Sequence, residues 1–253
     1  MGTKFSTRVW VSVVGIASIF WGSKGYADTV ISVADFGLKP DTRENAVAYV
    51  QKAIEACRGK EPVTLVFPEG RYDFWPQYAH EKNYYETNTY DVFPKRLAML
   101  FEGLHNITVD GKGSQFIMHD RIQPITVENC DGVTLKNFSI DWDIPLTAQA
   151  RVTKVGSDFF EIEINVLESP YIIEDGKLVF VGEGWKSALG SMIEFESDTH
   201  FVVPGTGDLV LGRNWRDYTA VSPRYGIVRL SRKGGFERYP AEGNWLVLRH
   251  STR

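Results

Sequence analysis

The chain has 253 residues, and its 28 Lys and Arg residues against 32 Asp and Glu residues give a formal net charge of −4 at pH 7. Lys4, Arg8 and Lys24 are the charged residues among the first 27, so without these three cations the formal charge falls from −4 to −7. This balance has the wrong sign for a partner with a phosphate backbone, and it argues against nucleic-acid binding.

Residues 1–27 have the pattern of an export signal. Lys4 and Arg8 precede an apolar run from Val9 to Phe20, and small residues before Asp28 offer a cleavage site after Ala27. The run is shorter than the roughly 20 residues that span a bilayer. We therefore predict a periplasmic or secreted protein with no stable membrane anchor.

The segment after the leader predicts a strand, a helix and a second strand. A helix is expected over residues 45–57, with Asn45 as its N-cap and Gly59 after its end. Its apolar residues recur at helical spacing: Ala46, Val47, Val50, Ala53, Ile54 and Cys57. The continuous apolar run 63–67, closed by Pro68-Glu69-Gly70, is typical of a buried strand that ends in a turn.

Two segments further on resemble each other. "FEGLHNITVDGKG" from Phe101 aligns with "VENCDGVTLKNFS" from Val127, so that residues 107–109 fall on residues 133–135 at an offset of 26. A repeat of this period with no helix inside it predicts a solenoid of parallel strands, in which stacked coils bury one another's apolar sides. The helix over 45–57 would then cover the open end of the stack.

From about Ala150 the pattern changes to alternating strands with Gly and Pro between them, beginning with a hairpin about Gly156-Ser157-Asp158. This pattern predicts an antiparallel sheet closed into a small barrel or sandwich. We place parallel coils in residues 28–147 and the antiparallel domain in residues 148–253. Three tryptophans that adjoin its strands are expected in its core: Trp185, Trp215 and Trp245.

The chain resembles two groups of known proteins. It resembles the opening of pectin-lyase-like proteins in the segments "VADFGLKPD", "VQKAIEAC" and "VTLVFPEGRY". It resembles the bacterial α-1,3-galactosidases of glycoside hydrolase family 110 in the segments "YDFWPQYAHEKNYYETNTYD", "NITVDGKGSQFIMHD" and "GVTLKNFSIDWDIPLTAQARV". The resemblance implies an all-β fold: a right-handed parallel β-helix with an amino-terminal capping helix, followed by an inserted antiparallel β-barrel. It implies inverting hydrolysis of terminal α-linked galactose in a glycan. It also implies catalytic carboxylates on later coils, beyond residue 253, so we assign none here.

The segment 67–93 is too polar for a core and unusually aromatic for a linker. Trp75, Tyr85 and Asn88 have the chemistry of a sugar-binding wall, because aromatic faces stack on the apolar side of a pyranose and amides bond its hydroxyls. Packing of the loop's own aromatics against the solenoid is the alternative.

Asp141 and Asp143 are the closest candidate pair of carboxylates. Residues two apart on a strand share a face, so both side chains could reach one cleft as substrate ligands. The alternative is structural, since Asp in solenoid turns often accepts hydrogen bonds from neighbouring backbone amides.

Other kinds of site find little support in the sequence. The five histidines, which are His80, His105, His119, His200 and His250, form no short-spaced zinc cluster, and we expect no metal and no cofactor. Cys57 and Cys130 could pair in an oxidising compartment or remain as two thiols. Two other functions stay open, namely a lyase or polygalacturonase on the same solenoid and a non-catalytic carbohydrate-binding or structural fragment.

Overall fold

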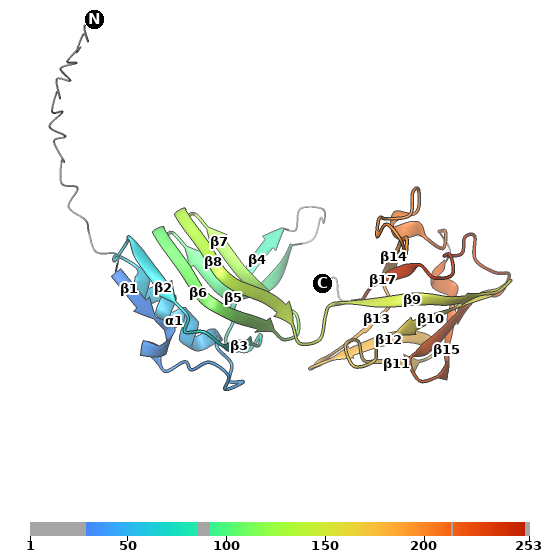
Figure 1. The fold of residues 1–253 in the computed structure, drawn as a ribbon, viewed down its shortest axis with the longest axis horizontal. Helices are drawn as coiled ribbons and strands as arrows, with labels where there is room; N and C mark the ends of the chain where they lie inside the picture. Colours follow the sequence, from blue (N-terminus) through green and yellow to red (C-terminus); the bar gives the residue numbers. More distant parts are fainter. Residues whose placement is uncertain (1–28, 86–91, 214, 251–253) are drawn as a thin grey trace, which may run out of the picture.

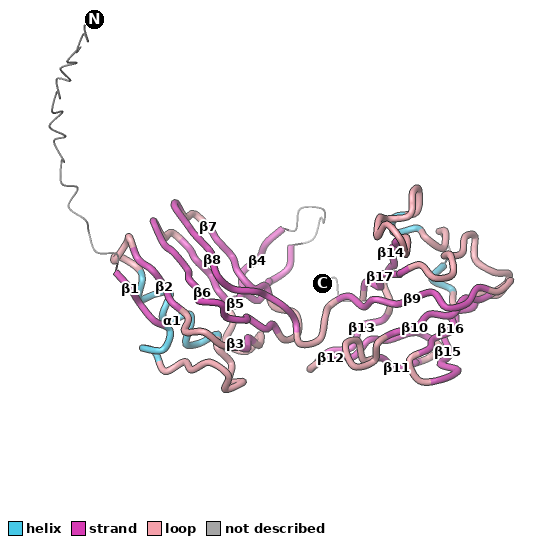
Figure 2. Tube along the Cα trace, viewed as in Figure 1, coloured by secondary structure: helices cyan, strands magenta, loops and turns pink. Residues whose placement is uncertain are grey.

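The computed structural model describes residues 29–85, 92–213 and 215–250. In this part of the chain, Figure 1 shows two lobes joined by one crossing between β8 and β9. Figure 2 shows that strands make up most of both lobes, so the fold is mostly β as predicted. Within the described ranges, no helix has the length and apolarity needed to cross a membrane.

The first lobe is built on two sheets and one α-helix. Its elements are β1 (Thr29–Ser32), a 3₁₀ helix (Val33–Phe36), α1 (Val47–Cys57), β2 (Val63–Val66), β3 (Arg71–Phe74), β4 (His80–Tyr85), β5 (Val92–Glu102), β6 (His105–Met118), β7 (Gln123–Glu128) and β8 (Asp131–Trp142). The larger sheet is parallel, with the order β1-β2-β6-β3 and with β8 also paired to β6. In the smaller sheet β5 pairs parallel with β7 and antiparallel with β4, so this lobe is not purely parallel.

The predicted repeat is confirmed as a stacked pair of strands. Ile107, Thr108 and Val109 of β6 pair in parallel with Val133, Thr134 and Leu135 of β8 at the expected offset. After a shift at the corner of β6, Ser114 pairs with Phe138, so β6 contains two residues more than β8 between the two paired stretches.

Gly111 makes this corner possible. A Cβ atom at Gly111 would lie 2.6 Å from the Cβ of Phe138 and 2.7 Å from the carbonyl oxygen of Asn137, which is too close for any side chain. The absence of a side chain therefore allows the corner of β6 to approach β8.

The core of the first lobe is aromatic at its centre. The ring of Phe116 lies 4.7 Å from the ring centroid of Phe67, 5.7 Å from that of Phe74 and 4.7 Å from that of Phe138. The apolar side of α1 packs into the same core through Val47, Val50, Ala53, Ile54 and Cys57.

The start of α1 differs slightly from the prediction. The N-cap position belongs to Ala46, and the Asn45 side chain instead accepts a 3.1 Å hydrogen bond from the backbone N–H of Val47. The same amide donates to the carbonyl of Gln77 at 2.9 Å and accepts from the backbone N–H of Trp75 at 3.3 Å. Asn45 therefore connects the start of the helix to the loop after β3. This role explains why Asn45 lies one residue before the N-cap and not at it.

The second lobe is antiparallel. Its strands are β9 (Thr147–Val155), β10 (Phe159–Ile164), β11 (Tyr171–Glu174), β12 (Lys177–Gly182), β13 (Trp185–Ala188), β14 (Ser191–Phe195), β15 (Thr219–Arg224), β16 (Ile227–Ser231) and β17 (Trp245–Arg249), with 3₁₀ helices at Gly207–Leu209 and Trp215–Asp217. One sheet has the order β14-β17-β9-β10-β16-β15, and the other has the order β11-β12-β13.

Of the two predicted arrangements, a closed barrel or a sandwich, the described part of this lobe does not form the closed barrel. β14 and β15 form the two ends of the six-stranded sheet and do not pair with each other. The second sheet covers the inner face of the larger sheet, so the larger sheet need not close on itself. The two sheets share one core, which contains residues of β12 and of the larger sheet: Leu178, Phe180, Ala148, Phe160 and Leu246. Packing one sheet on the other buries the apolar faces without a continuous hydrogen-bonded ring.

The three tryptophans of this lobe have different environments. Trp215 is buried in the core, and Trp185 is partly buried and packs against this core. The expectation for Trp245 was wrong, because β17 turns Leu246 and Leu248 inward and leaves Trp245 half-buried on the outer face.

Both cysteines are free thiols, which agrees with the second of the two alternatives. Cys57 bonds the carbonyl of Ala53 at 3.2 Å, and burial raises the pKa of its thiol to about 11. Cys130 instead donates to the carbonyl of Phe101 at 3.3 Å.

Candidate functional site

The carboxyl ends of three parallel strands form a ledge on the first lobe. Phe74, Met118 and Trp142, the last residues of β3, β6 and β8, pair in one row. The next residues are Trp75, His119 and Asp143, and the backbone N–H groups of the last two donate to the carbonyls of Phe74 and Met118 at 2.9 and 3.0 Å. We call this row of three residues the strand-end ledge. Its side chains lie on consecutive rungs although they are far apart in sequence.

An ion pair lies directly behind the ledge. Arg71 and Asp73 share one face of β3, and the Arg71 guanidinium donates to Asp73 at 2.6, 3.0 and 3.1 Å and to Asp143 at 3.0 Å. The Asp73 side chain has 0% exposure. Burial alone would raise the pKa of this carboxyl, but hydrogen bonds from Arg71 and His119 outweigh it and lower the pKa below its usual value. Asp73 is therefore a fixed anion at neutral pH.

His119 connects the two lobes. Its Nε2 lies 2.8 Å from Asp73, and its Nδ1 lies 2.8 Å from Glu183, which belongs to the turn between β12 and β13 of the second lobe. The indole of Trp75 stacks on the imidazole at 3.8 Å between centroids and donates from Nε1 to Glu183 at 2.9 Å. Glu183 thus accepts hydrogen bonds from two neighbouring rungs of the first lobe.

The ledge brings together groups that resemble metal ligands. Atoms of His119, Asp143 and Glu183 lie within 4.8 Å of one another. However, the Arg71 guanidinium already contacts Asp143 at 3.0 Å, and Arg43 lies 3.9 Å from the same carboxylate. These guanidinium groups balance the carboxylates and would repel a metal cation. We therefore interpret these side chains as an ion-pair cluster, which consists of Arg71, Asp73, His119, Asp143 and Glu183.

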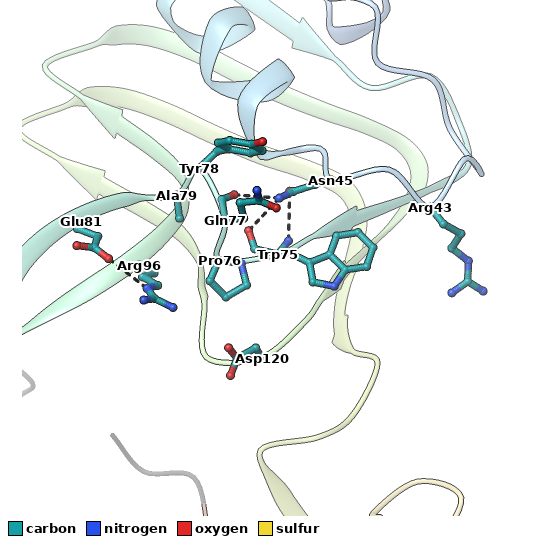
Figure 3. A pocket seen from close by; sticks show the side chains of 10 residues that line it. All are labelled: Arg43, Asn45, Trp75, Pro76, Gln77, Tyr78, Ala79, Glu81, Arg96 and Asp120. Carbon is teal, nitrogen blue, oxygen red and sulfur yellow. Dashed lines mark hydrogen bonds and ion pairs between the residues drawn. The ribbon is translucent and has the colours of Figure 1, made fainter. Parts of the chain in front are cut away.

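A cavity of about 710 Å³ opens beside the ledge, and its volume is within the range of small-molecule sites. Figure 3 shows the Trp75 indole between Arg43 and Pro76, with Asn45 bonded to the loop behind it. Its lining combines an aromatic ring with amides, carboxylates and guanidinium groups: Arg43, Asn45, Trp75, Pro76, Gln77, Tyr78, Ala79, Glu81, Arg96 and Asp120. The cavity can therefore offer a stacking surface together with hydrogen-bond donors and acceptors.

The structure places the predicted substrate ligands in different environments. Trp75 lines the cavity, and Asp143 belongs to the ion-pair cluster. Asp141 accepts a 2.8 Å bond from the backbone N–H of Trp142, as in the structural alternative. The side chain of Tyr85 and the whole of Asn88 lie outside the described residues.

Four residues of the ion-pair cluster were not singled out as site candidates from the sequence: Arg71, Asp73, His119 and Glu183. The alternation of β3 carried a signal for two of them, because Tyr72 and Phe74 are core residues, and Arg71 and Asp73, which alternate with them, must share the other face. Glu183 gave no such signal, since it lies on a turn of the other lobe.

A second charged cluster bears on the lyase alternative. Lys82 donates to Glu102 at 2.8 Å and to Glu128 at 2.7 Å, and Tyr84 also donates to Glu128. Hydrogen bonds to these carboxylates raise the pKa of Lys82, and the bond to Glu128 raises the pKa of Tyr84. Both side chains keep their protons at neutral pH, so neither supplies the base that a lyase requires.

Glu183→Ala is expected to loosen the contact between the lobes while each lobe stays folded. The substitution removes the acceptor of two hydrogen bonds, but the Glu183 side chain is 47% exposed, so the loss of stability should stay within about 1 kcal/mol. The indole N–H signal of Trp75 should move in a ¹⁵N heteronuclear NMR spectrum, and chymotrypsin should cleave after Leu146 several-fold faster.

Glu174→Ala is the matched control. Glu174 also forms a half-exposed ion pair, at 2.8 Å with Lys186, but this pair lies within the second lobe. An unchanged Trp75 signal and cleavage rate in Glu183→Ala, or an equal effect in Glu174→Ala, would contradict a role in joining the lobes.

Comparison with known proteins gives consistent matches. The family model for GLAA-B β-barrel domain I matches residues 148–246. Alpha-1,3-galactosidase B of Bacteroides thetaiotaomicron is 57% identical over 229 residues, which are 90% of this chain and 37% of that protein. Alpha-1,3-galactosidase A of Shewanella woodyi is 32% identical over 88% of this chain and 36% of its own length. Alpha-1,3-galactosidase A of Bacteroides fragilis strain YCH46 is 33% identical over 89% of this chain and 37% of its own length.

Proposed function

This chain is a homologue of bacterial α-1,3-galactosidases, and from that premise we propose that it acts in a glycoside hydrolase that removes terminal α-linked galactose from glycans. The observation that carries the proposal is the 57% identity to the B. thetaiotaomicron enzyme across 90% of the chain. The chain spans 37% of the length of that relative. We therefore assign it a part of the substrate-binding surface and do not assign it the complete catalytic centre.

The architecture proposed for the first lobe is the beginning of a right-handed parallel β-helix. The pairing of β1, β2, β6 and β8 in one parallel sheet and of β5 with β7 in another supports it, as two parallel sheets are what successive coils produce. The charged and apolar pattern of residues 1–27 supports export to the periplasm or the medium.

The cavity beside the ledge is the proposed place for a galactose unit. The Trp75 ring can stack on the apolar side of a pyranose, while Gln77 and Asp120 offer amide and carboxylate groups to its hydroxyls. Hydrogen bonding of Trp75 to Glu183 and its stacking on His119 hold the indole in one orientation, so little conformational entropy is lost on binding.

The mechanism expected from the resemblance is inverting hydrolysis, which needs a proton-donating and a proton-accepting carboxyl group about 6.5 to 9.5 Å apart. Asp73 does not fit the acid role, because its bonds to Arg71 and His119 keep it ionised. Asp110 does not fit either, since hydrogen bonds from Asn137 and Lys112 lower its pKa. We propose that the catalytic carboxylates belong to the part of the relatives' length that this chain does not span.

Binding of α-1,3-linked galactobiose to the full chain tests this proposal, with titration calorimetry as the measurement. Trp75→Ala should weaken binding about tenfold, since the stacking surface for the sugar is lost. Trp75→Phe should keep most of the affinity, and β-linked galactobiose should bind less tightly to the unchanged chain.

Tyr225→Ala is the control, because Tyr225 is 81% exposed on the second lobe and should leave the affinity unchanged. Equal affinities of the unchanged chain and Trp75→Ala would reject the cavity as the sugar site. Release of galactose by the chain would show that it contains the catalytic carboxylates, and would overturn our placement of them.

A further inference from the structure

The outer face of the second lobe carries an apolar patch where an antiparallel sheet ordinarily presents polar side chains to water. Phe195 of β14 pairs with Trp245 of β17, and in the next row Ile193 pairs with Val247. The neighbouring strand β9 continues the second row with Gln149, which pairs with Val247. All these positions alternate with core residues, so their side chains face away from the core.

A cavity of about 360 Å³ lies over this patch. Its lining is formed by Gln149, Phe195, His200, Trp245 and Val247. The loop after β14 brings His200 there: the His200 backbone N–H donates to the carbonyl of Glu196 at 3.0 Å, and its φ angle is +56°. The rings of Phe195 and Trp245 belong to strands, so the cavity has a fixed aromatic floor and one wall from a turn.

The polar groups of the cavity are not engaged elsewhere. Within the described part of the chain, the Gln149 amide, the His200 imidazole and the Trp245 indole N–H form no side-chain hydrogen bond or ion pair. The ledge differs in this respect, because the side chains of Trp75, His119 and Asp143 already bond to Glu183, Asp73 and Arg71. The cavity on the second lobe can therefore satisfy a ligand without breaking existing contacts.

We propose that this cavity, defined by Gln149, Phe195, His200, Trp245 and Val247, is a second carbohydrate site that binds an uncharged hexopyranose unit of a glycan. The ring of Trp245, with Phe195 beside it, stacks on the apolar face of the sugar. The Gln149 amide donates and accepts hydrogen bonds, and the His200 imidazole and Trp245 N–H add donors for the hydroxyl groups.

The charge of the lining selects a neutral ligand. None of its five residues carries a carboxylate, an ammonium or a guanidinium group, so the lining holds no permanent charge to pair with a charged sugar. Its volume of about 360 Å³ lies at the lower end of the range for small-molecule sites, which fits one sugar ring better than a protein segment. The site would hold a glycan on the lobe that does not contain the Trp75 cavity.

Titration of the ¹⁵N-labelled full chain with methyl α-D-galactopyranoside, followed by heteronuclear NMR, tests the proposal. The indole N–H signal of Trp245 and the side-chain amide of Gln149 should shift together and give one dissociation constant. Trp245→Ala should weaken this binding about tenfold, while Trp245→Phe, which keeps a stacking ring, should retain most of it. Gln149→Ala changes an exposed side chain and should weaken binding without unfolding the lobe.

Trp75→Ala separates this site from the proposed hydrolase site, because it should leave the shifts at Trp245 and Gln149 unchanged. Shifts confined to Trp75 would overturn the second site and leave the first intact. Shifts of the Trp245 signal with protein concentration in the absence of sugar, and none with sugar, would overturn it in favour of contact between two copies of the chain. Equal binding by Trp245→Ala and the unchanged chain would overturn it too.

Discussion

Replacing Arg71 with Met should lower the free energy of unfolding by about 3 kcal/mol, the lower end of the range for removing one partner of a buried ion pair. Asp73 is fully buried, and the substitution would leave His119 as its remaining close partner, with Arg43 at 4.0 Å. The buried carboxylate would then lose its closest hydrogen bonds, which is costly for a charged group.

The pH dependence gives a second signature of this pair. The pKa of Asp73 is lowered in the folded protein, so its contribution is complete above the ordinary Asp value of about 3.9 and is lost as the pH falls through the folded pKa. Arg71→Met removes part of this lowering. The stability difference between the two proteins should therefore be largest at neutral pH and shrink in acid.

Urea unfolding followed by circular dichroism at neutral and acidic pH measures both effects. Arg58→Met is the control, because Arg58 forms a half-exposed pair with Glu55 at 3.1 Å and should change stability by less than about 1 kcal/mol. A stability loss in Arg71→Met no larger than in Arg58→Met would show that the Asp73 carboxylate does not depend on this guanidinium.

Phe116→Ala should be at least as damaging, with a loss of about 3 to 5 kcal/mol. Its ring has no exposed surface and packs against four other aromatic rings, two from β3, one from β8 and one from the segment after β2. Removing it opens a cavity that these strands cannot close without giving up their pairing. Phe116→Leu should recover part of the loss, because it refills some of the volume.

The two lobes have separate hydrophobic cores, so two unfolding transitions are expected in denaturant or on heating. Phe116→Ala should move the transition of the first lobe and leave the second unchanged. Phe201→Ala, at a side chain that is 72% exposed on the second lobe, should move neither by more than about 0.5 kcal/mol. A shift of both transitions by Phe116→Ala would mean that the lobes unfold as one unit.

The sequence predicted the strand pairing where local similarity was strong. Residues 107–109 and 133–135 share a pattern of apolar and hydroxyl side chains, and their pairing followed from it. The same reasoning could not extend to the strand-end ledge, because the pairing of β6 with β8 shifts between Asp110 and Ser114. Beyond that point the offset seen in the first half no longer aligns His119 with Asp143.

The candidate site was only partly predictable for a related reason. Trp75 was singled out by composition, since an exposed aromatic among amides is unusual. Its contacts with His119 and Glu183 depend on the placement of one lobe against the other, which no local pattern encodes. Trp245 was misplaced because "WLVLR" is apolar at four of its five positions, so the run cannot show which alternate residues face inward.

The two surplus residues at the corner of β6 have a consequence for how the chain can change in length. The surplus lies in an unpaired turn, where Lys112 and Gly113 have positive φ angles, and the inward residues change from Ile107 and Val109 before it to Phe116 and Met118 after it. The turn therefore separates the register of the ledge from the register of the first half of β6. A change of length between Asp110 and Ser114 can be absorbed in this turn while Phe116 stays paired with Ile140, whereas the same change inside either paired stretch would turn the following side chains to the other face.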